Sequence, residues 1–186
     1  MRIEPRRLKG IFEITPSPHL DARGYMVRLF DSEIFRQAGL ETTWVQESRS
    51  HTRWKHTLRG LHLSLPPALE GKTITAIHGE VLWVVVDMRL GSETFGQWDA
   101  VVLSSERHNT LCAQQGFAHG CLSLTDECDL FLRADTSFSE QHGTGILWND
   151  EELGIDWGLD GVEPLVSERD RLYPTFKKFR ERYGGV

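Results

Sequence analysis

Three short stretches of this sequence carry side chains whose types and spacing could do chemistry. The first is Leu58–His62 (LRGLH), which is followed by Gly71 and Lys72. The second is Gln115–Gly120 (QGFAHG), a histidine between glycines ahead of an expected strand. The third is Ser167–Asp170 (SERD), a polar stretch before an expected C-terminal helix. A neutral histidine oriented by a buried aspartate can act as a base, while nearby cations hold an anion.

Each stretch also has a purely structural interpretation. His62 could be a core histidine, the third stretch could form a helix capping box, and Arg59 and Lys72 could be solvated surface charges. In a regular strand Arg59 and His62 face opposite sides, and a bulge or bend at Gly60 could bring them to the same side. Spacing alone leaves these alternatives open.

Several other chemistries lack their usual motifs. The sequence has no G-x-G-x-x-G, G-x-x-x-x-G-K-[ST] or G-x-S-x-G motif, so a built-in nicotinamide or ATP site and a serine nucleophile elbow are not expected. Small β-barrels often bind metal through a His-x-His pair plus a carboxylate. Here His62 stands alone, and His119 has no second ligand nearby. We therefore expect no metal and no cofactor.

Composition and charge narrow the class of protein. The chain has 186 residues, 39% of them hydrophobic and 26% charged, which is typical of a single globular domain spanning residues 1–186. The net charge of -6 argues against a nucleic-acid partner. The longest apolar run, Val81–Val86, is far short of the roughly 20 residues that a membrane helix needs, and no signal peptide is visible. Three cysteines form no CxxC pair. We expect a soluble, cytoplasmic protein that binds no membrane.

The middle of the chain alternates β-rich segments with turn signals. The expected strands are Lys72–His78, Val81–Asp87, Ala100–Ser104, Thr110–Ala113, Gly120–Leu124 and Asp129–Ala134. Helices are expected only near the ends, at Asp31–Ala38 and Phe176–Tyr183. Strand spacing of about 8 to 12 residues favours a sandwich or barrel over βαβ repeats, and a jelly roll is the simplest such architecture.

The order and spacing of these motifs resemble the dTDP-4-dehydrorhamnose 3,5-epimerase family, whose members act on nucleotide-linked 4-keto sugars. The resemblance runs from about Phe12 to Pro174. Besides the three stretches above, it includes DARG at 21–24, VQ at 45–46, GEV at 79–81, TFG at 94–96, WND at 148–150 and GIDW at 154–157. It implies an all-β, cupin-like jelly-roll β-barrel with a few short peripheral helices, which forms a homodimer and uses no cofactor.

The resemblance also implies roles for individual residues. His62 would be the general base, paired with Asp170, and would remove the proton next to the 4-keto group. Lys72 would donate to the enolate oxygen, since a carbon acid next to a ketone needs a positioned base and charge stabilisation. The implied substrate-binding residues are Arg59 and His119 around the sugar and diphosphate, Arg23 and Gln46 nearer the nucleotide, Phe138 stacked on the base, and Arg169 where the family often has a lysine.

The sequence departs from the family at the proton donor. The usual donor is a tyrosine in the strand after the second stretch, and its equivalent here is Leu132, which has no proton to give. Two glutamates near the nucleotide are replaced by Arg28 and Gly143. We therefore expect reprotonation by water or another side chain, and inversion of one carbon (C3 or C5) at least as readily as both. The nucleotide could be dTDP, CDP or GDP.

The leading hypothesis is an isomerase, an epimerase of a nucleotide-diphosphate-linked 4-keto sugar in deoxysugar or surface-polysaccharide synthesis. One alternative is a keto-isomerase of a similar sugar on the same fold. A second alternative, from a different class, is a catalytically silent nucleotide-sugar-binding protein. The presence of both His62 and Asp170 argues against the silent protein, because binding alone does not require that pair.

Overall fold

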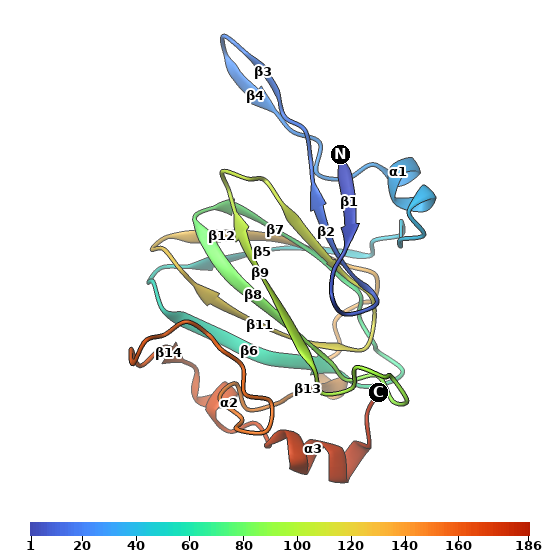
Figure 1. Cartoon of the computed structure of the whole chain (residues 1–186), viewed down its shortest axis with the longest axis vertical. Coiled ribbons are helices and arrows are strands. Elements are labelled where there is room, and N and C mark those ends of the chain that lie inside the picture. The colour runs from blue at the N-terminus through green and yellow to red at the C-terminus, as the bar shows by residue number, and fades with distance from the viewer.

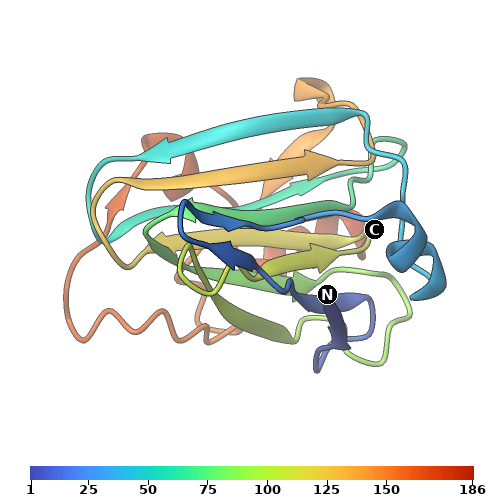
Figure 2. The ribbon, with the colours of Figure 1, turned by 90° about the horizontal axis from the view of Figure 1, so that it is seen from above.

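A computed structural model describes all residues, 1–186, and consists mainly of two antiparallel sheets that lie face to face (Figures 1 and 2). The first sheet has the strand order β1-β2-β10-β7-β12-β5. In that order its strands are Arg2–Pro5, Ile11–Thr15, Thr110–Ala113, Lys72–His78, Cys128–Ala134 and Gln46–Thr52.

The second sheet has the order β13-β6-β11-β8-β9, and the short β14 pairs in parallel with β6. In that order its strands are Gly143–Gly145, Thr57–Ser64, Phe117–Ser123, Glu80–Asp87 and Trp98–Ser104, with β14 at Leu165–Val166. The chain crosses between the two sheets repeatedly, so residues far apart in sequence face each other between them.

The remaining elements lie at the periphery. A hairpin of β3 (His19–Asp21) and β4 (Gly24–Met26) projects from the barrel, as Figure 1 shows. The helices are α1 (Ser32–Gln37), the 3₁₀ turn η1 (Glu140–His142), α2 (Glu168–Arg171) and α3 (Phe176–Tyr183). Asp31 caps α1 by accepting the N–H groups of Glu33 and Ile34.

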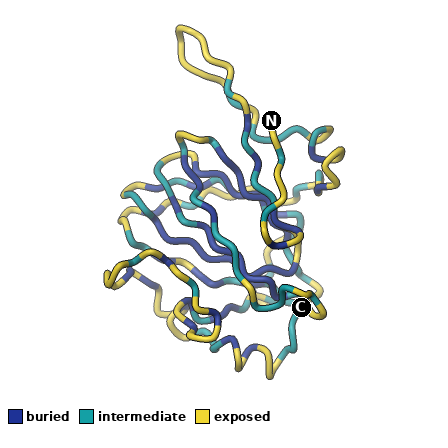
Figure 3. The backbone as a smooth tube through the Cα atoms, in the orientation of Figure 1, coloured by how far each residue is buried: buried dark blue, intermediate teal, exposed yellow.

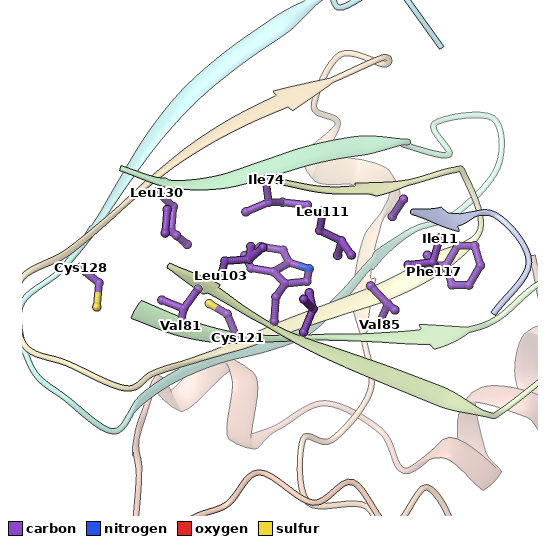
Figure 4. Close-up of a cluster of buried hydrophobic side chains, with 14 of the residues drawn as sticks. Ile11, Ile74, Val81, Val85, Leu103, Leu111, Phe117, Cys121, Cys128 and Leu130 are labelled. Carbon is purple, nitrogen blue, oxygen red and sulfur yellow. The ribbon is translucent and has the colours of Figure 1, made fainter. Parts of the chain in front are cut away.

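Buried apolar side chains form two large clusters, one on each side of the second sheet. The first cluster fills the space between the sheets and includes Ile74, Val85 and Leu111 (Figure 4). The other lies on the outer face of the second sheet, where α3 contributes Phe176 and Phe179. Figure 3 shows the central strands of the two sheets as largely buried and the hairpin as exposed. The second sheet is therefore covered on both faces, which fixes its strands firmly.

The structure confirms the all-β fold class and most of the expected elements. Lys72–His78 and Thr110–Ala113 are strands with the expected bounds, and Phe176–Tyr183 is a helix. The boundary expected at Gly120 is wrong, because β11 begins three residues earlier, at Phe117. Glycine is needed inside this strand, since a Cβ at Gly120 would lie 2.8 Å from the Trp157 ring. No helix in the structure has the length and apolar character needed to cross a membrane.

Candidate active site

A bulge in β6 sets the direction of the side chains that carry the candidate chemistry. His62 pairs with His119 of β11, whereas Arg59 pairs with Cys121, so β6 has one more residue than β11 over this interval. Gly60 takes a positive φ of 113°, and a Cβ there would lie 2.5 Å from the carbonyl oxygen of His119. Only glycine fits this backbone. Of the alternatives that the sequence left open, the structure shows a bulge at Gly60, and Arg59 and His62 line one shared groove.

His62 and Asp170 form a hydrogen-bonded pair. Nε2 of His62 lies 2.9 Å from Oδ1 of Asp170, and the backbone N–H of Gly60 donates to Oδ2 at 3.0 Å. Ser167 caps α2 by accepting the N–H of Asp170, so half of the predicted capping box is present. The Asp170 side chain does not complete the box, because both of its oxygens are bonded to β6.

The Asp170 carboxyl group is buried yet stays ionised. Burial alone would raise its pKa, but the hydrogen bonds from His62 and Gly60 and the nearby charges of His62 and Arg169 lower the pKa to about 2. An ionised carboxylate accepts the Nε2–H of His62 and so fixes the ring orientation and the neutral tautomer. The other ring nitrogen, Nδ1, keeps its lone pair and can accept a proton.

A cavity of about 320 Å³ lies beside this pair and draws side chains from both sheets. Its lining includes the predicted site residues His62, Lys72, His119, Phe138 and Arg169. Lys72 comes from β7 of the first sheet, and its Nζ lies 3.0 Å from a carboxylate oxygen of Glu70. His62 and His119 come from the second sheet, so the cavity places a base and a cation on facing walls.

His119 is buried beside the cavity and is 5% exposed. The indole Nε1–H of Trp83 donates to Nδ1 of His119 at 3.3 Å. Burial, followed by the charges of Lys72 and His62, holds the pKa of His119 well below its ordinary value. His119 is therefore a neutral imidazole at physiological pH.

Leu132 faces the space between the sheets from the first sheet. It lies on β12 opposite Ile74 and packs against the cluster between the sheets. This position is across from the sheet that carries His62. Leu132 is not among the residues that line the cavity, and its side chain has no proton to donate.

Arg59, predicted to lie near the sugar and diphosphate, and Arg169, predicted to bind substrate, line a second groove next to the cavity. Its lining includes Arg59, Arg169 and Asp170, and His62 belongs to both spaces. The guanidinium of Arg59 donates to the hydroxyl of Thr52 at 3.3 Å and to the carbonyl oxygen of His51 at 3.2 Å. The Arg169 Nη2 lies 3.4 Å from Nε2 of His62. Two cations therefore stand on the solvent side of the base.

The predicted nucleotide-binding residues are more scattered. Phe138 is 69% exposed at the edge of the cavity, and its backbone N–H donates to Oε1 of Gln46. Arg23 is not among the cavity residues. It lies at the tip of the β3–β4 hairpin and forms an ion pair with Asp21 at 2.5 Å (Figure 1). The structure therefore brings Gln46 and Phe138 together and leaves Arg23 apart.

Several cavity residues were missed by reasoning from the sequence. Tyr173 lines the cavity, and its ring packs edge-on against His62 with centroids 5.9 Å apart. A Cβ on Gly145 would lie 2.5 Å from this ring, so glycine makes room for Tyr173. Glu70 and Glu140 also line the cavity. Tyr173 lies three residues after Asp170 and is one of only three tyrosines in the chain. These two features were all that the sequence offered to mark it as a candidate site residue.

The arrangement can take a proton from a carbon acid and stabilise the resulting negative charge. Nδ1 of His62 is the available base, and Lys72 is the facing cation. No group of three or more His, Cys, Asp or Glu side chains is gathered closely enough to hold a metal ion.

Comparison with known proteins agrees with this site and fold. The family described as dTDP-4-dehydrorhamnose 3,5-epimerase matches residues 5–178. An enzyme of that name from Methanothermobacter thermautotrophicus is 38% identical over 175 residues, covering 94% of this chain and 92% of its own length.

Solved structures agree as well. The rmlC epimerase of Mycobacterium tuberculosis superposes with a TM-score of 0.93 at 35% identity, covering 98% of this chain and 92% of its own. ChmJ, a 3'-monoepimerase from Streptomyces bikiniensis solved in complex with dTDP-quinovose, gives a TM-score of 0.89 at 34% identity, covering 97% and 90%. With an all-β, cupin-like jelly-roll fold and a family match over most of its length, the chain belongs to the dTDP-4-dehydrorhamnose 3,5-epimerase family.

Proposed function

We propose that this protein is an epimerase of a nucleotide-diphosphate-linked 4-keto sugar, with residues 1–186 acting as one domain. The observation that carries the proposal is the His62–Asp170 pair, held at 2.9 Å on the wall of a cavity that also contains Lys72. Binding of a nucleotide sugar needs no such pair, whereas removal of a proton next to a ketone does.

The proposed reaction begins at His62. Nδ1 takes the proton from the carbon next to the C4 ketone, and the electron pair of that C–H bond moves to form an enolate with its charge on the C4 oxygen. Asp170 stabilises the imidazolium that results, and Lys72 donates to the enolate oxygen from the facing sheet. Return of a proton to the opposite face of the same carbon inverts it and regenerates the ketone.

Leu132 decides how many carbons are inverted in this proposal. An efficient second inversion needs a proton donor on the side of the sugar opposite His62. Leu132, at the position where the family resemblance places that donor, is an apolar residue packed against the cluster between the sheets. We propose that one carbon, C3 or C5, is inverted efficiently, with the proton supplied by water or by a side chain other than residue 132. Among the structural neighbours, ChmJ is named a 3'-monoepimerase, so single inversion occurs on this fold.

The proposed substrate lies across the cavity and the adjoining groove. The sugar fits the cavity beside His62, His119 and Lys72, while Arg59 and Arg169 offer cations for the diphosphate. Phe138 presents an exposed ring for stacking on the base, next to Gln46. The Methanothermobacter relative carries dTDP in its name, and ChmJ was solved in complex with dTDP-quinovose, which makes dTDP the first carrier to test, ahead of CDP and GDP.

A homodimer in the cytoplasm is part of the proposal. The β3–β4 hairpin exposes Leu20, Tyr25 and Met26, which are 81%, 60% and 67% exposed. A second copy packed on the hairpin would cover these apolar side chains and would give Arg23 a cavity to reach in its partner. The three cysteines are all free, which is typical of a reducing compartment.

The test is solvent deuterium incorporation into dTDP-, CDP- and GDP-linked 4-keto sugars, followed by NMR. The proposal predicts exchange at C3 or C5 together with inversion of one of them. Movement of the carbonyl along the ring would identify a keto-isomerase. Tight binding with no exchange on any of the three carriers would identify a binding protein and contradict the proposal.

A further inference from the structure

Trp83 controls which nitrogen of His119 carries the proton. Trp83 lies on β8 and His119 on β11, as diagonal neighbours whose rings both face the space between the sheets. The indole Nε1 has a hydrogen and no lone pair to offer, so it can only donate. At 3.3 Å from Nδ1 of His119, it requires that nitrogen to be the acceptor. The proton of the neutral ring must then be on Nε2.

Positive charge near His119 opposes a second proton on its ring. The Lys72 ammonium approaches from β7 of the first sheet, and His62, which becomes positive when it accepts a proton, is paired with His119 on the neighbouring β6. Both rings of the Trp83–His119 pair are buried, at 6% and 5% exposed, so water does not compensate a charge there. His119 is thereby restricted to one protonation state and one tautomer.

The Nε2–H of His119 has no partner within the protein. It is one of two buried side-chain nitrogen or oxygen atoms in the chain without a hydrogen bond. His119 is among the residues that line the cavity, as is Lys72. A buried donor left without an acceptor is unfavourable, and such groups in native proteins commonly serve a ligand. The acceptor must therefore come from whatever occupies the cavity.

We propose that Trp83 is a positioning residue that holds His119 as the neutral Nε2–H tautomer, so that His119 and Lys72 together donate to the C4 oxygen of the 4-keto sugar. The two donors come from opposite sheets and converge on one cavity, which is the arrangement that stabilises a developing enolate. A neutral imidazole with its lone pair already bonded to Trp83 cannot accept a proton. His62 is then the only histidine of the cavity that can act as the base. This inference rests on the proposed function.

The first test measures the tautomer directly in the free protein. Two-bond ¹H–¹⁵N spectra of ¹⁵N-labelled protein distinguish the two neutral tautomers from the charged ring, and His119→Gln identifies the His119 signals by their loss. We expect the neutral Nε2–H form of His119 across the neutral pH range. An Nδ1–H tautomer, or a charged ring at neutral pH, would overturn the inference without any reference to activity.

The second test removes the indole donor with Trp83→Phe. We expect the Nδ1–H form of His119 to become populated and kcat for carbon-bound proton exchange to fall roughly tenfold or more, with KM changing much less, because the donor acts mainly on the charged oxygen. Trp44→Phe is the matched control, since the Trp44 indole also lacks a hydrogen-bond partner and packs in a separate cluster near α1. Its kcat should equal that of the wild type.

A third comparison applies even if Trp83→Phe does not fold. Glutamine can place an N–H near the position of Nε2, whereas asparagine places its amide near Nδ1, so His119→Gln should retain a higher kcat than His119→Asn. Equal losses in the two variants, or a changed tautomer with unchanged kcat in Trp83→Phe, would overturn the donor role. A wild-type protein that exchanges no 4-keto sugar but has the Nε2–H tautomer would contradict the proposed function and leave the tautomer assignment standing.

Discussion

His62 and Asp170 are 108 positions apart in the chain and 2.9 Å apart in the fold. The contact depends on the β6 bulge, which presents the Gly60 N–H to the second oxygen of the same carboxylate at 3.0 Å. A carboxylate held from two sides cannot swing away when the ring it orients changes charge. The pair therefore holds the His62 ring, which lines the cavity, in one orientation with Nδ1 not bonded to Asp170.

Replacing Asp170 with asparagine should impair proton exchange strongly. An amide can present its N–H to Nε2 of His62, which favours the wrong tautomer and moves the ring proton to Nδ1, where the lone pair is needed. We expect exchange to fall about 10²–10⁴-fold. The measurement is the rate of deuterium incorporation. Asp129→Asn, which removes a surface carboxylate paired with Arg49, is the control and should exchange normally.

Asp87 should contribute to the free energy of unfolding at neutral pH and lose that contribution at low pH. Burial raises its pKa, but hydrogen bonds from Arg89, Ser92 and Thr94 outweigh burial and lower the pKa from 3.8 to about 2. A carboxyl group with a lowered folded-state pKa stabilises the protein above its unfolded-state pKa and loses that contribution as the pH falls through the folded-state pKa. Asp87→Asn should therefore cost about 2 kcal/mol at neutral pH.

The pH profile makes this prediction specific. The difference in unfolding free energy between the wild type and Asp87→Asn, from denaturant titrations, should be constant above about pH 5 and shrink as the pH falls from about 4 to 2. A difference that stays constant down to pH 2 would mean that Asp87 acts through packing alone.

Arg59 should contribute to binding of the diphosphate. Its guanidinium faces the groove that adjoins His62, and charge-assisted contacts to phosphate are strong. Arg59→Ala is expected to weaken nucleotide-sugar binding by about tenfold or more, measured by calorimetry. The control is Arg49→Ala, which removes an exposed arginine on β5 of the first sheet and should leave binding unchanged. If Arg59→Ala weakens binding of the free sugar equally, the phosphate assignment is wrong.

Phe138 should contribute to binding of the base. The ring is exposed at the cavity edge, and stacking between a base and an aromatic ring is worth roughly 1–3 kcal/mol in nucleic-acid sites. Phe138→Ala should lose affinity in this range, while Phe138→Tyr should keep it. An unchanged affinity for Phe138→Ala in calorimetry would place the base elsewhere.

Leu132→Tyr should increase inversion at a second carbon. The new hydroxyl would extend from β12 of the first sheet, where an apolar side chain now packs against the cluster between the sheets. The larger ring must fit beside Ile74, so we expect a stability loss of about 1–3 kcal/mol alongside the gain. Product stereochemistry and deuterium content on one substrate check this. Efficient double inversion by the wild type would mean that another acid already serves that wall.

Strands that are rich in β-branched or apolar residues could be predicted from the sequence. Strands that are polar and form only by pairing with another strand could not. Lys72–His78 is rich in β-branched residues and has the expected bounds. Gln46–Thr52 is polar and almost wholly exposed, so no hydrophobic alternation marks it, and its pairing with β12 makes it a strand. The strand that contains Gly120 begins earlier than the sequence predicts. A glycine usually marks the end of a strand, and the close approach of the Trp157 ring, which makes glycine necessary inside this one, is not apparent from the sequence.

The site divides in the same way. The sequence could name a bulge at Gly60 as one way to bring Arg59 and His62 together, although the spacing could not decide for it. The pairing of His62 with Asp170 came from the family resemblance. The role of Trp83 could not be predicted from the sequence, because an aromatic residue in an apolar strand is expected to pack in the core rather than to orient a histidine. Its role depends on a diagonal contact between two strands, which the sequence does not specify.

The most direct test of the account is deuterium incorporation from D₂O into a dTDP-linked 4-keto sugar, measured by NMR for the wild type and His62→Ala side by side. The account predicts exchange at a carbon next to the ketone in the wild type, with inversion of one such carbon. His62→Ala should fold normally, bind the nucleotide sugar, and exchange about 10²–10⁴-fold more slowly. Exchange by His62→Ala at the wild-type rate would contradict the assignment of His62 as the base.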